Sequence, residues 1–369
     1  MMDGRTLEIA MIGSKGIPAV FGGIEKHVEE ISVRLAARGH KVTVYGRAPF
    51  SGRGPWKGVR LKIAPSIRTK SLDTATNSMA ASMSALFGRY DIVHYHGIGP
   101  SIFCNIPVRP GTRSVATIHA LDYRQSKWGP VARRLLMTGE RKAVTRTDAA
   151  IAVSRLMASG LAERYGREVH YIPNGASIAD YPGDELLSGM GLEKERYILS
   201  VGRFIVERGF HTLIEAFRRV KTRMKLVIAG DARFEEEYAA RLRGLADDRV
   251  VMPGYVTGAR LEQLYANCAL YVLPSLVEGL PISLIEAMSH MRPVLVSDIP
   301  ENLEVARGIG ITFSAGSAGD LESALSRMLA MSGPDMVEMG RKGREKVERE
   351  YDWDKVTGKI EQLYMSILA

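Results

Sequence analysis

Short apolar runs alternate with longer amphipathic segments along the whole chain. This alternation is typical of βαβ units, in which parallel strands form a sheet and the intervening helices cover both of its faces. A first series of strands is expected at 7–12, 41–45, 59–64, 91–95, 114–118, 149–153 and 169–172. A second series is expected at 197–201, 225–229, 249–252, 270–273, 293–296 and 310–313. The pattern therefore predicts an α/β protein with two Rossmann-like, doubly wound domains.

A polar, glycine-dotted stretch separates the two series and runs from Pro173-Asn174-Gly175 to about Glu195. The length of 369 residues also favours two domains, because one domain averages about 150 residues. We expect a first domain at 1–178, a second at 179–352, and a C-terminal helix at 353–369 that crosses back to the first. Doubly wound sheets bind ligands outside the carboxyl ends of their strands, so site residues are expected in the loops that follow strands.

Composition indicates an ordinary folded protein but does not identify its binding partner. Hydrophobic residues make up 46% and charged residues 25%, which is ordinary for a folded protein. The formal net charge of +9 suits nucleic acid, anionic lipid or phosphorylated small molecules equally well. No apolar run approaches the roughly 18 residues of a membrane span, and the N-terminus leads directly into a strand, so we expect a cytoplasmic protein.

Two further patterns predict packing rather than chemistry. Cys104 and Cys268 are far apart and lack the spacing of a zinc site, so both are expected to be small buried hydrophobic residues. The region that begins at Ser71 has apolar residues at roughly helical spacing, which predicts one apolar face of a helix. These residues are Leu72, Met79, Met83 and Leu86.

Four glycines lie between the first strand and the first helix, which is expected at 24–38: Gly13, Gly16, Gly22 and Gly23. Glycine lets a ligand approach the backbone closely, and the N–H groups of such a loop can face an anion. The spacing is not Gly-x-Gly-x-x-Gly, and Tyr45-Gly46-Arg47 stands where a ribose-binding acidic residue would end the second strand. An NAD site is therefore disfavoured, while a merely tight turn stays an alternative.

Two arginines follow the first strand of the second series. Gly202-Arg203 ends that strand, and Glu207-Arg208-Gly209 opens the next helix. Two guanidinium groups beside a helix N-terminus make a suitable clamp for a diphosphate. Taken singly, each arginine is also compatible with a solvated surface charge.

The sharpest motif is the segment from Pro274 to Met288, PSLVEGLPISLIEAM. Pro281 suits the first turn of a helix, Gly279 permits a tight entry, and the first N–H groups, those of Ile282, Ser283 and Leu284, can face an anion. Glu278 lies in the loop before this helix and Glu286 lies within it, so the two carboxylates can hold different hydroxyls of one ligand. Alternatively, Glu278 favours the helix dipole and Glu286 is a surface charge.

Together these motifs resemble the donor site of retaining GT-B glycosyltransferases of the family 4 type. The resemblance covers almost the whole chain and includes the segments 172–175, 229–231 and 253–255. The segments 12–25 and 118–128 are similar to a bacterial branch often described as rhamnosyltransferase-like. The chain departs from the family pattern at Arg208, where lysine is common, and at Met291, near which glycine is common. The resemblance implies two Rossmann-like domains that face each other across a cleft.

The resemblance also implies roles for the donor-site residues. Arg203 and Arg208 would neutralise the leaving diphosphate, so no metal or other cofactor is expected. Glu286 would bind the ribose hydroxyls, and Glu278 would hold hydroxyls of the transferred sugar. Backbone groups complete the expected donor site: Gly22, Gly23, Gly202, Gly254, Tyr255, Gly279, Ile282, Ser283 and Leu284.

On the first domain, the resemblance implies that His119 positions the donor near the anomeric centre or the phosphate. A hydrogen-bonded core histidine is the alternative. The adjoining Asp122, Arg124 and Lys127 favour a polar, acceptor-side cleft. Two basic series could face anionic headgroups or a lipid diphosphate, or could simply be solvated: Lys57, Arg60, Lys62, Arg68 and Lys70, and Arg133, Arg134, Arg141, Lys142 and Arg146.

The function expected from this resemblance is transfer of a sugar, with retention, from a nucleotide sugar to a glycan or lipid-linked glycan. Bacterial surface polysaccharide is the expected product, rhamnose a candidate sugar, and the inner face of the plasma membrane a candidate location. An epimerase or phosphorylase of the same fold, a nucleotide-sugar sensor and a basic nucleic-acid-binding protein stay alternatives. Nucleic acid is not an expected partner, because the sequence offers no recognition helices or aromatic and basic RNA platform.

Overall fold

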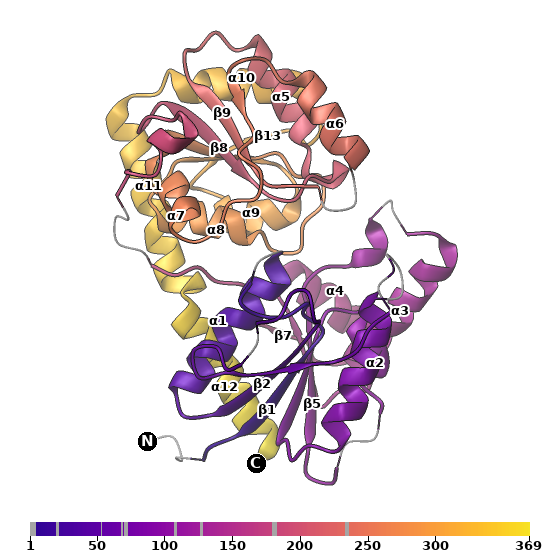
Figure 1. Ribbon diagram of the computed structural model, residues 1–369. Coiled ribbons are helices and arrows are strands. Elements are labelled where there is room, and N and C mark those ends of the chain that lie inside the picture. The colour runs from indigo at the N-terminus through magenta and orange to yellow at the C-terminus, as the bar shows by residue number, and fades with distance from the viewer. Residues whose placement is uncertain are drawn as a thin grey trace. The chain divides into compact units, whose positions relative to one another are not determined.

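The computed structural model describes residues 5–19, 22–52, 54–67, 69, 73–106, 109–125, 128–178, 183–232 and 236–369 (Figure 1). The chain forms two compact units. Unit 1 contains Met1–Asn174 and Trp353–Ala369, and unit 2 contains Gly175–Asp352. The chain therefore passes from the first unit to the second after Asn174 and returns to the first at Trp353.

Unit 1 is built on a seven-stranded sheet in the order β3-β2-β1-β4-β5-β6-β7, and all its strand pairs are parallel. The strands are β1 (Glu8–Ile12), β2 (Lys41–Gly46), β3 (Arg60–Ile63), β4 (Ile92–His96), β5 (Arg113–Ile118), β6 (Ala149–Ala152) and β7 (His170–Tyr171). The inner strand β1 pairs Ile9 with Val42 of β2 on one side and with Ile92 of the central strand β4 on the other. The first predicted series of strands is confirmed, with no strand end shifted by more than one residue.

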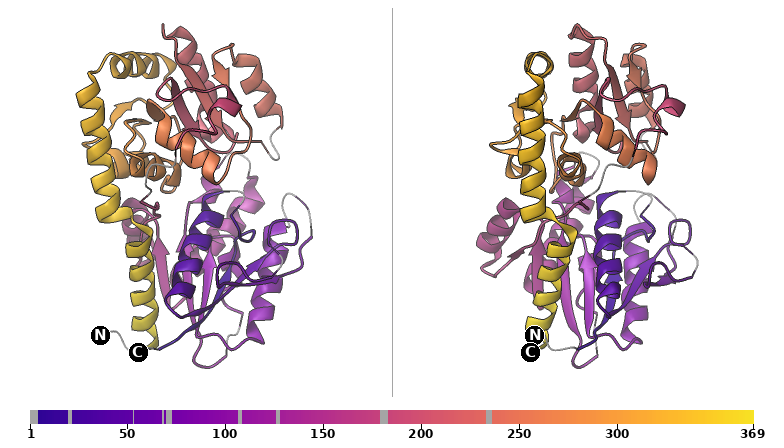
Figure 2. Two further views of the ribbon diagram at one scale, coloured as in Figure 1. Left: turned by 60° about the vertical axis from the view of Figure 1, so that its left-hand side comes forward. Right: turned by 90° about the vertical axis from the view of Figure 1, so that its left-hand side faces the viewer.

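Two hydrophobic cores cover the two faces of this sheet, because successive strand residues point to opposite sides. Ile9 and Met11 pack with α1 (Gly23–Ala37) and α12 (Trp353–Leu368), whereas Ala10 and Ile12 pack in the second core. The helices that contribute to the second core are α2 (Asp73–Leu86), α3 (Pro130–Thr145) and α4 (Arg155–Tyr165). Figures 1 and 2 show α12 running beside the same sheet, although it is the end of the chain.

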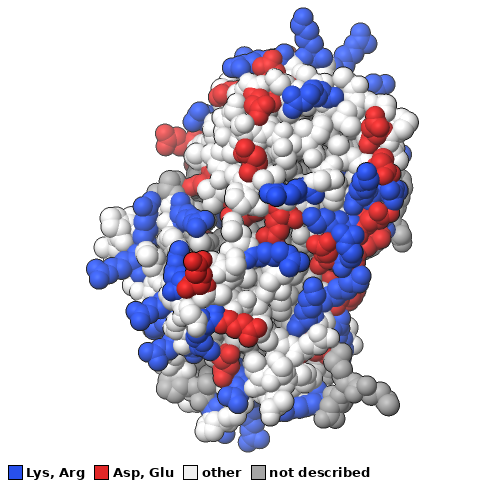
Figure 3. All heavy atoms as spheres, turned by 180° about the vertical axis from the view of Figure 1, so that it is seen from behind, with Lys and Arg blue, Asp and Glu red and all other residues white. Residues whose placement is uncertain are grey.

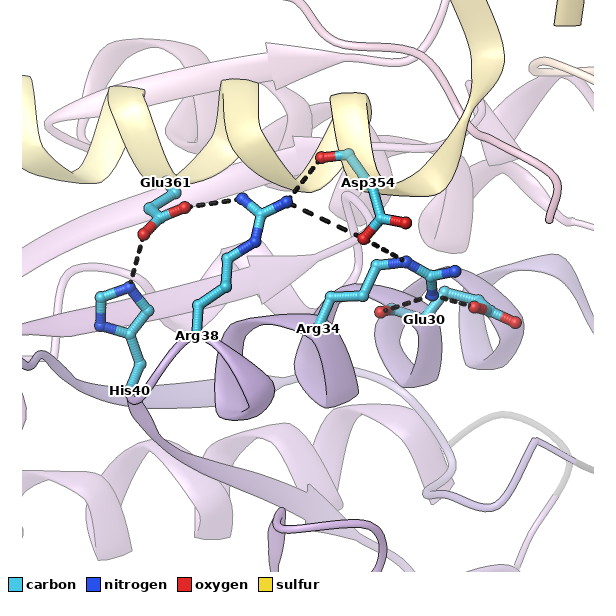
Figure 4. A network of polar contacts seen from close by, with 6 residues as sticks. All are labelled: Glu30, Arg34, Arg38, His40, Asp354 and Glu361. Atoms are coloured by element: carbon cyan, nitrogen blue, oxygen red, sulfur yellow. Dashed lines mark hydrogen bonds and ion pairs between the residues drawn. The ribbon is translucent and has the colours of Figure 1, made fainter. Parts of the chain in front are cut away.

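A polar network fastens α12 to α1 (Figure 4). Arg38 donates to Glu361 Oε2 at 2.7 Å and to the backbone carbonyl of Asp354 at 2.7 Å. His40 Nε2 contacts the other Glu361 oxygen at 3.0 Å, and Arg34 Nε pairs with Asp354 at 3.2 Å. Beneath this network, the Trp353 and Ile360 side chains of α12 are fully buried.

Helix α2 differs from its prediction in the face that it buries. Met79 and Met83, which belong to the expected apolar face, are 43% and 53% exposed, and Leu72 lies outside the described residues. The buried face is made of smaller residues: Asn77, Ser78, Ala81, Ser82 and Ala85. Small side chains allow a helix backbone to lie close to its neighbours, whereas the larger Met79 and Met83 stay at the surface.

Unit 2 has a six-stranded parallel sheet in the order β10-β9-β8-β11-β12-β13. Its strands are β8 (Tyr197–Val201), β9 (Lys225–Ala229), β10 (Val250–Val251), β11 (Leu270–Leu273), β12 (Val294–Ser297) and β13 (Ile311–Phe313). Its helices are α5 (Phe210–Arg219), α6 (Glu236–Leu245), α7 (Ala259–Asn267), α8 (Ile282–Ser289), α9 (Pro300–Ala306), α10 (Ala318–Leu329) and α11 (Gly333–Lys346). The second predicted series is confirmed, so the chain has two doubly wound parallel sheets.

Side chains of α5, α6 and α10 form the core on one face of this sheet. Cys268 in unit 2 and Cys104 in unit 1 are both free and buried, as their sequence context predicts. Among the described residues, no helix combines the length and the apolar character that crossing a membrane requires.

Candidate functional site

Loops that follow three neighbouring strands of unit 2 hydrogen-bond to one another. The Gly202 N–H donates to the Ala229 carbonyl at 3.0 Å, and the Gly230 N–H donates to the Gly254 carbonyl at 2.9 Å. A Cβ at Gly230 would lie 1.8 Å from the Gly202 oxygen, so only glycine fits there. These contacts bring the backbones of Gly202, Gly230 and Gly254 together at the carboxyl edge of the sheet.

Arg208, Glu278 and Ser275 form a polar cluster at this edge. Arg208 Nη1 pairs with Glu278 Oε1, and Ser275 Oγ donates to the same oxygen at 2.7 Å. The Leu276 N–H donates to the Glu207 carbonyl at 2.8 Å, which ties the loop after β11 to the 3₁₀ helix Val206–Arg208. A guanidinium has five N–H donors, so the pairing with Glu278 leaves Arg208 able to bind an anion as well.

Position 209 has no room for a side chain. Its φ is +66°, and a Cβ would lie 2.1 Å from the Pro274 carbonyl oxygen. Gly209 therefore permits the close approach of the two loops that carry Arg208 and Glu278.

Helix α8 begins beside this cluster, with Pro281 as its N-cap residue. The Leu284 N–H donates to the Pro281 carbonyl at 3.2 Å, so one of the three N–H groups expected to face an anion already has a partner. Within the described chain, the N–H groups of Ile282 and Ser283 make no such bond. These two donors, at the positive end of the helix dipole, could bind an anion. Gly279, just before the helix, is buried.

Glu286, inside α8, is held by a buried tyrosine. Tyr265 Oη donates to Glu286 Oε2 at 3.1 Å, and burial together with the Glu286 charge raises the pKa of Tyr265 well above its usual range. The Tyr265 ring stacks on His290 at 5.9 Å, and burial lowers the pKa of His290 to about 4. Arg203 and Tyr255, by contrast, are exposed on the surface of unit 2.

In unit 1, two carboxylates of α1 accept hydrogen bonds from backbone N–H groups of the glycine loop. The Lys15 N–H donates to Glu25 Oε1 at 3.0 Å, and the Ala19 N–H donates to Glu29 Oε2 at 2.6 Å. The N–H groups of this loop were expected to face a bound anion. These two instead have carboxylate partners within unit 1. Gly22, the N-cap residue of α1, has φ +94°, and a Cβ there would lie 2.7 Å from Glu25 Oε2. Gly23 is the first residue of that helix.

His119 follows β5 and belongs to a buried group of histidines. Its Nε2 lies 3.3 Å from His96 Nδ1, and its ring packs against the His27 ring, with the centroids 4.6 Å apart. Only 8% of His119 is exposed. Burial lowers the pKa values of His96 and His119 well below their usual range and that of His27 to about 4. All three imidazoles are therefore neutral near pH 7.

The residues expected on the acceptor side follow His119 directly. Asp122 and Arg124 lie in the 3₁₀ helix Asp122–Arg124, where Gln125 Nε2 donates to Asp122 Oδ1 at 3.3 Å. Arg124 is exposed to solvent, and Lys127 lies outside the described residues.

Comparison with known families identifies both halves of the chain. Residues 21–180 match the family described as Glycosyltransferase Family 4. Residues 195–331 match the family described as Glycosyl transferases group 1. The chain is a glycosyltransferase, and each of its halves is similar to one of these two families. These matches agree with the family 4 part of the resemblance that the motifs suggested.

Curated relatives align with nearly the full length of this glycosyltransferase. A glycogen synthase of Mycobacterium tuberculosis is 27% identical, with 98% of this chain and 95% of the relative covered. A phosphatidyl-myo-inositol mannosyltransferase of Mycolicibacterium smegmatis is 25% identical, with 94% and 90% covered.

Solved structures share the two-domain fold of this glycosyltransferase. Sucrose-phosphate synthase of Thermosynechococcus elongatus aligns with a TM-score of 0.84 at 21% identity, over 98% of this chain and 99% of that one. The Anabaena protein HepE in complex with UDP-glucose aligns with a TM-score of 0.80 at 17% identity, over 98% and 100%. Sucrose-phosphate synthase is of the GT-B type, so the fold class predicted from the sequence is confirmed.

Sequence reasoning singled out His119 in this glycosyltransferase but missed the histidines around it. His94 and His96 are two residues apart on β4, so they point to the same face of the sheet, and this spacing was the available signal. His27 lies on α1, far away in sequence, and only the fold brings it to the group. His27, His96 and His119 each have one ring nitrogen within 4.8 Å of the others, a spacing that could hold a metal ion.

Proposed function

We propose that this glycosyltransferase takes its sugar from a nucleotide sugar and transfers it with retention of anomeric configuration. The main support for a nucleotide-sugar donor is the pairing of Arg208 with Glu278 beside the N-terminus of α8. This arrangement offers cationic and N–H donors for a diphosphate and a carboxylate for hydroxyl groups. The likeness to the HepE structure, which contains UDP-glucose, supports the same donor class.

The diphosphate is proposed to lie against Arg203, Arg208 and the N–H groups of Ile282 and Ser283. Their positive charge stabilises the negative charge that develops on the leaving phosphate. Because two guanidinium groups can supply this charge, the reaction is proposed to need no metal ion. Gly22 and Gly23 are proposed to add backbone contacts to the same phosphates.

The two carboxylates divide the hydroxyl groups of the donor between them. Glu286, oriented by Tyr265, is proposed to bind the ribose hydroxyls. Glu278, oriented by Ser275 and Arg208, is proposed to bind hydroxyls of the transferred sugar. The backbone at Gly254 and Tyr255 then faces the base, and Gly202 and Gly279 leave room for the donor.

Transfer is proposed to occur on the face from which the diphosphate leaves. The acceptor oxygen forms its bond to the anomeric carbon while the bond to the phosphate oxygen breaks, and the acceptor proton passes to that phosphate oxygen. His119 is proposed to position the donor sugar for this step. Asp122, Arg124 and Lys127 are proposed to contact the acceptor.

The acceptor is proposed to be a glycan or lipid-linked glycan of a bacterial surface polysaccharide, with rhamnose from dTDP-rhamnose as one candidate sugar. A relative named for phosphatidyl-myo-inositol supports an acceptor with a lipid part. Helix α3 offers a surface for such a lipid, because the apolar Val131 and Leu135 are 76% and 54% exposed beside the exposed Arg133 and Arg134. We therefore propose peripheral contact with an anionic membrane on its cytoplasmic face.

Calorimetry with UDP, GDP and dTDP, in the presence of EDTA, tests the donor site. One nucleoside diphosphate is expected to bind saturably, and Arg203→Ala and Glu286→Ala are expected to weaken that binding by roughly tenfold or more, as loss of a charged hydrogen bond costs about 1.5 to 3 kcal/mol. Arg219→Ala and Glu322→Ala are matched controls, because these two residues pair with each other at 3.7 Å away from the proposed site.

Turnover of the matching nucleotide sugar then separates the possible reactions. Transfer to a glycan acceptor in EDTA supports the proposal, with retention read from the anomeric configuration of the product. Release of product only in the presence of phosphate would identify a phosphorylase, and turnover without an acceptor an epimerase. Binding without turnover would identify a sensor, and failure of all three nucleotides to bind would contradict the donor site.

A further inference from the structure

In the buried histidine group of unit 1, the hydrogen-bond partners determine which ring nitrogens carry protons. His96 is fully buried, with Nδ1 at 3.3 Å from His119 Nε2 and Nε2 at 3.4 Å from Met11 Sδ. His27 is also fully buried, with Nδ1 at 3.0 Å from Asn174 Oδ1. An uncharged imidazole carries a single N–H proton, on either Nδ1 or Nε2.

The partner atoms decide which nitrogen carries that proton. A thioether sulfur has no hydrogen and can only accept, so the proton of His96 lies on Nε2 and points at Met11. His96 Nδ1 is then a bare acceptor, and the proton in the contact with His119 belongs to His119 Nε2.

The ring nitrogens of His27 do not alter the hydrogen bond between His96 and His119. The amide oxygen of Asn174 can only accept, so the proton of His27 lies on Nδ1. The Nε2 atom of His27 is buried and has no hydrogen-bond partner among the described residues. His27 therefore packs its ring against His119 and donates no hydrogen bond to His96.

We propose that His96 is a positioning residue that holds His119 in one orientation and one tautomer, with the proton on Nε2 and a bare Nδ1. Because Nε2 faces His96, Nδ1 is the ring nitrogen of His119 that is left for a substrate. A bare nitrogen accepts a hydrogen bond from an O–H group, whereas it would repel an unprotonated phosphate oxygen. His119 therefore binds a sugar hydroxyl and not the diphosphate; this consequence rests on the proposed function.

Nitrogen NMR of protein labelled in its histidine rings tests the tautomer without any substrate. At pH 7.5 and in EDTA, His119 is expected to show a protonated Nε2 and an unprotonated Nδ1, and His96 likewise. The signals are assigned from those lost in His96→Asn and His119→Gln. A His119 ring protonated on Nδ1, or charged, would overturn the proposal. So would a metal ion found bound at one equivalent to the purified protein, because the metal would take the Nε2 position of the proton.

Matched variants at His96 separate positioning from mere packing. In His96→Leu no acceptor faces His119, whereas the Asn side-chain oxygen in His96→Asn can replace Nδ1. We expect kcat for transfer from UDP-glucose, GDP-mannose or dTDP-rhamnose, whichever the enzyme uses, to fall by roughly tenfold or more in His96→Leu. His96→Asn is expected to stay within about threefold of the parent, because the acceptor is kept.

Three readouts keep the interpretation unambiguous. Nucleoside diphosphate affinity and the melting temperature report whether each variant is folded, and both are expected to change little in His96→Asn. Equal kcat losses in the two folded variants, or no loss in His96→Leu, would refute the positioning role. A parent enzyme that uses none of the three nucleotide sugars would instead overturn the proposed function, and the tautomer would still be read from the spectra.

Discussion

Met291 occupies a backbone position that normally belongs to glycine. Its φ is +58°, and it follows the C-cap residue His290 of α8. The Met291 N–H donates to the Met288 carbonyl, and the Arg292 N–H donates to the Ala287 carbonyl, which together form a Schellman-type helix end. The departure noted at this position in the sequence is therefore a matter of local backbone conformation.

Met291→Gly is expected to stabilise unit 2 by about 1 kcal/mol, because a left-handed conformation costs other residues roughly 1–2 kcal/mol and glycine little. Met291 is 38% exposed, so part of this gain is offset by lost side-chain contacts. Urea unfolding measures the change. Met291→Ala is the control, since it removes the same side chain but keeps the unfavourable φ. Equal stabilities of the two variants would contradict the argument.

The buried histidines predict that unit 1 loses stability in acid. Burial lowers the pKa of His27 from 6.5 to about 4, so the unfolded chain binds its proton at a higher pH than the folded chain does. Stability is therefore complete above about pH 6.5 and decreases as the pH falls toward 4. For His27 alone the loss at pH 5 is about 2 kcal/mol.

Urea unfolding of the parent and of His27→Gln, each at pH 7.5 and 5.0, measures this contribution. The variant lacks the titrating group, so its stability is expected to fall less between the two pH values, by about 2 kcal/mol. Comparing each protein with itself removes the packing cost of the substitution. An identical pH dependence in both proteins would show that the neutral His27 does not contribute.

At the scale of elements, α12 is part of the core of unit 1. Ile360 and Tyr364 are fully buried, and Tyr364 Oη lies 2.6 Å from His94 Nδ1 on the central part of the sheet. The network of Arg38, His40 and Glu361 adds charged contacts along the same helix (Figure 4). The end of the chain thus completes a hydrophobic face that α1 covers only in part.

Ile360→Ala is expected to destabilise unit 1 by about 2–5 kcal/mol, because it leaves a cavity in a closely packed core. Gln362→Ala is the matched control on the same helix, since that position is exposed and its replacement is expected to change stability by less than about 0.5 kcal/mol. Chemical denaturation measures both. A loss below about 1 kcal/mol for Ile360→Ala would show that α12 is not packed as described.

At the scale of the whole molecule, charge is the property that bears on partners. The formal net charge is +9, yet Figure 3 shows Lys and Arg on the rear face interspersed with Asp and Glu. The local composition of a surface therefore matters more than the total. On α3, exposed Arg133 and Arg134 adjoin exposed apolar residues, a combination that favours an anionic lipid surface.

Cosedimentation with phosphatidylglycerol vesicles is expected at low salt and is expected to weaken at high salt, because salt screens the attraction. Replacing Arg133 and Arg134 together by Gln is expected to weaken binding by roughly 30-fold, at about 1 kcal/mol for each charge. Arg341→Gln is the control, since Arg341 is an exposed arginine of unit 2 paired with Glu338. Protein that stays in the supernatant at low salt would contradict membrane contact.

The alternation of apolar runs and amphipathic segments, together with local motifs, was enough to determine both parallel sheets and the family, because strand and helix periods and glycine-dependent turns are properties of neighbouring residues. It also pointed to Arg208, Glu278 and His119. Only the tertiary structure decided which groups these residues meet: Arg208 with Glu278, Glu25 with the glycine loop, and His119 with His96. The reason is physical, since each of these contacts joins segments that chain folding brings together, and a buried polar atom takes whichever partner the fold places within reach.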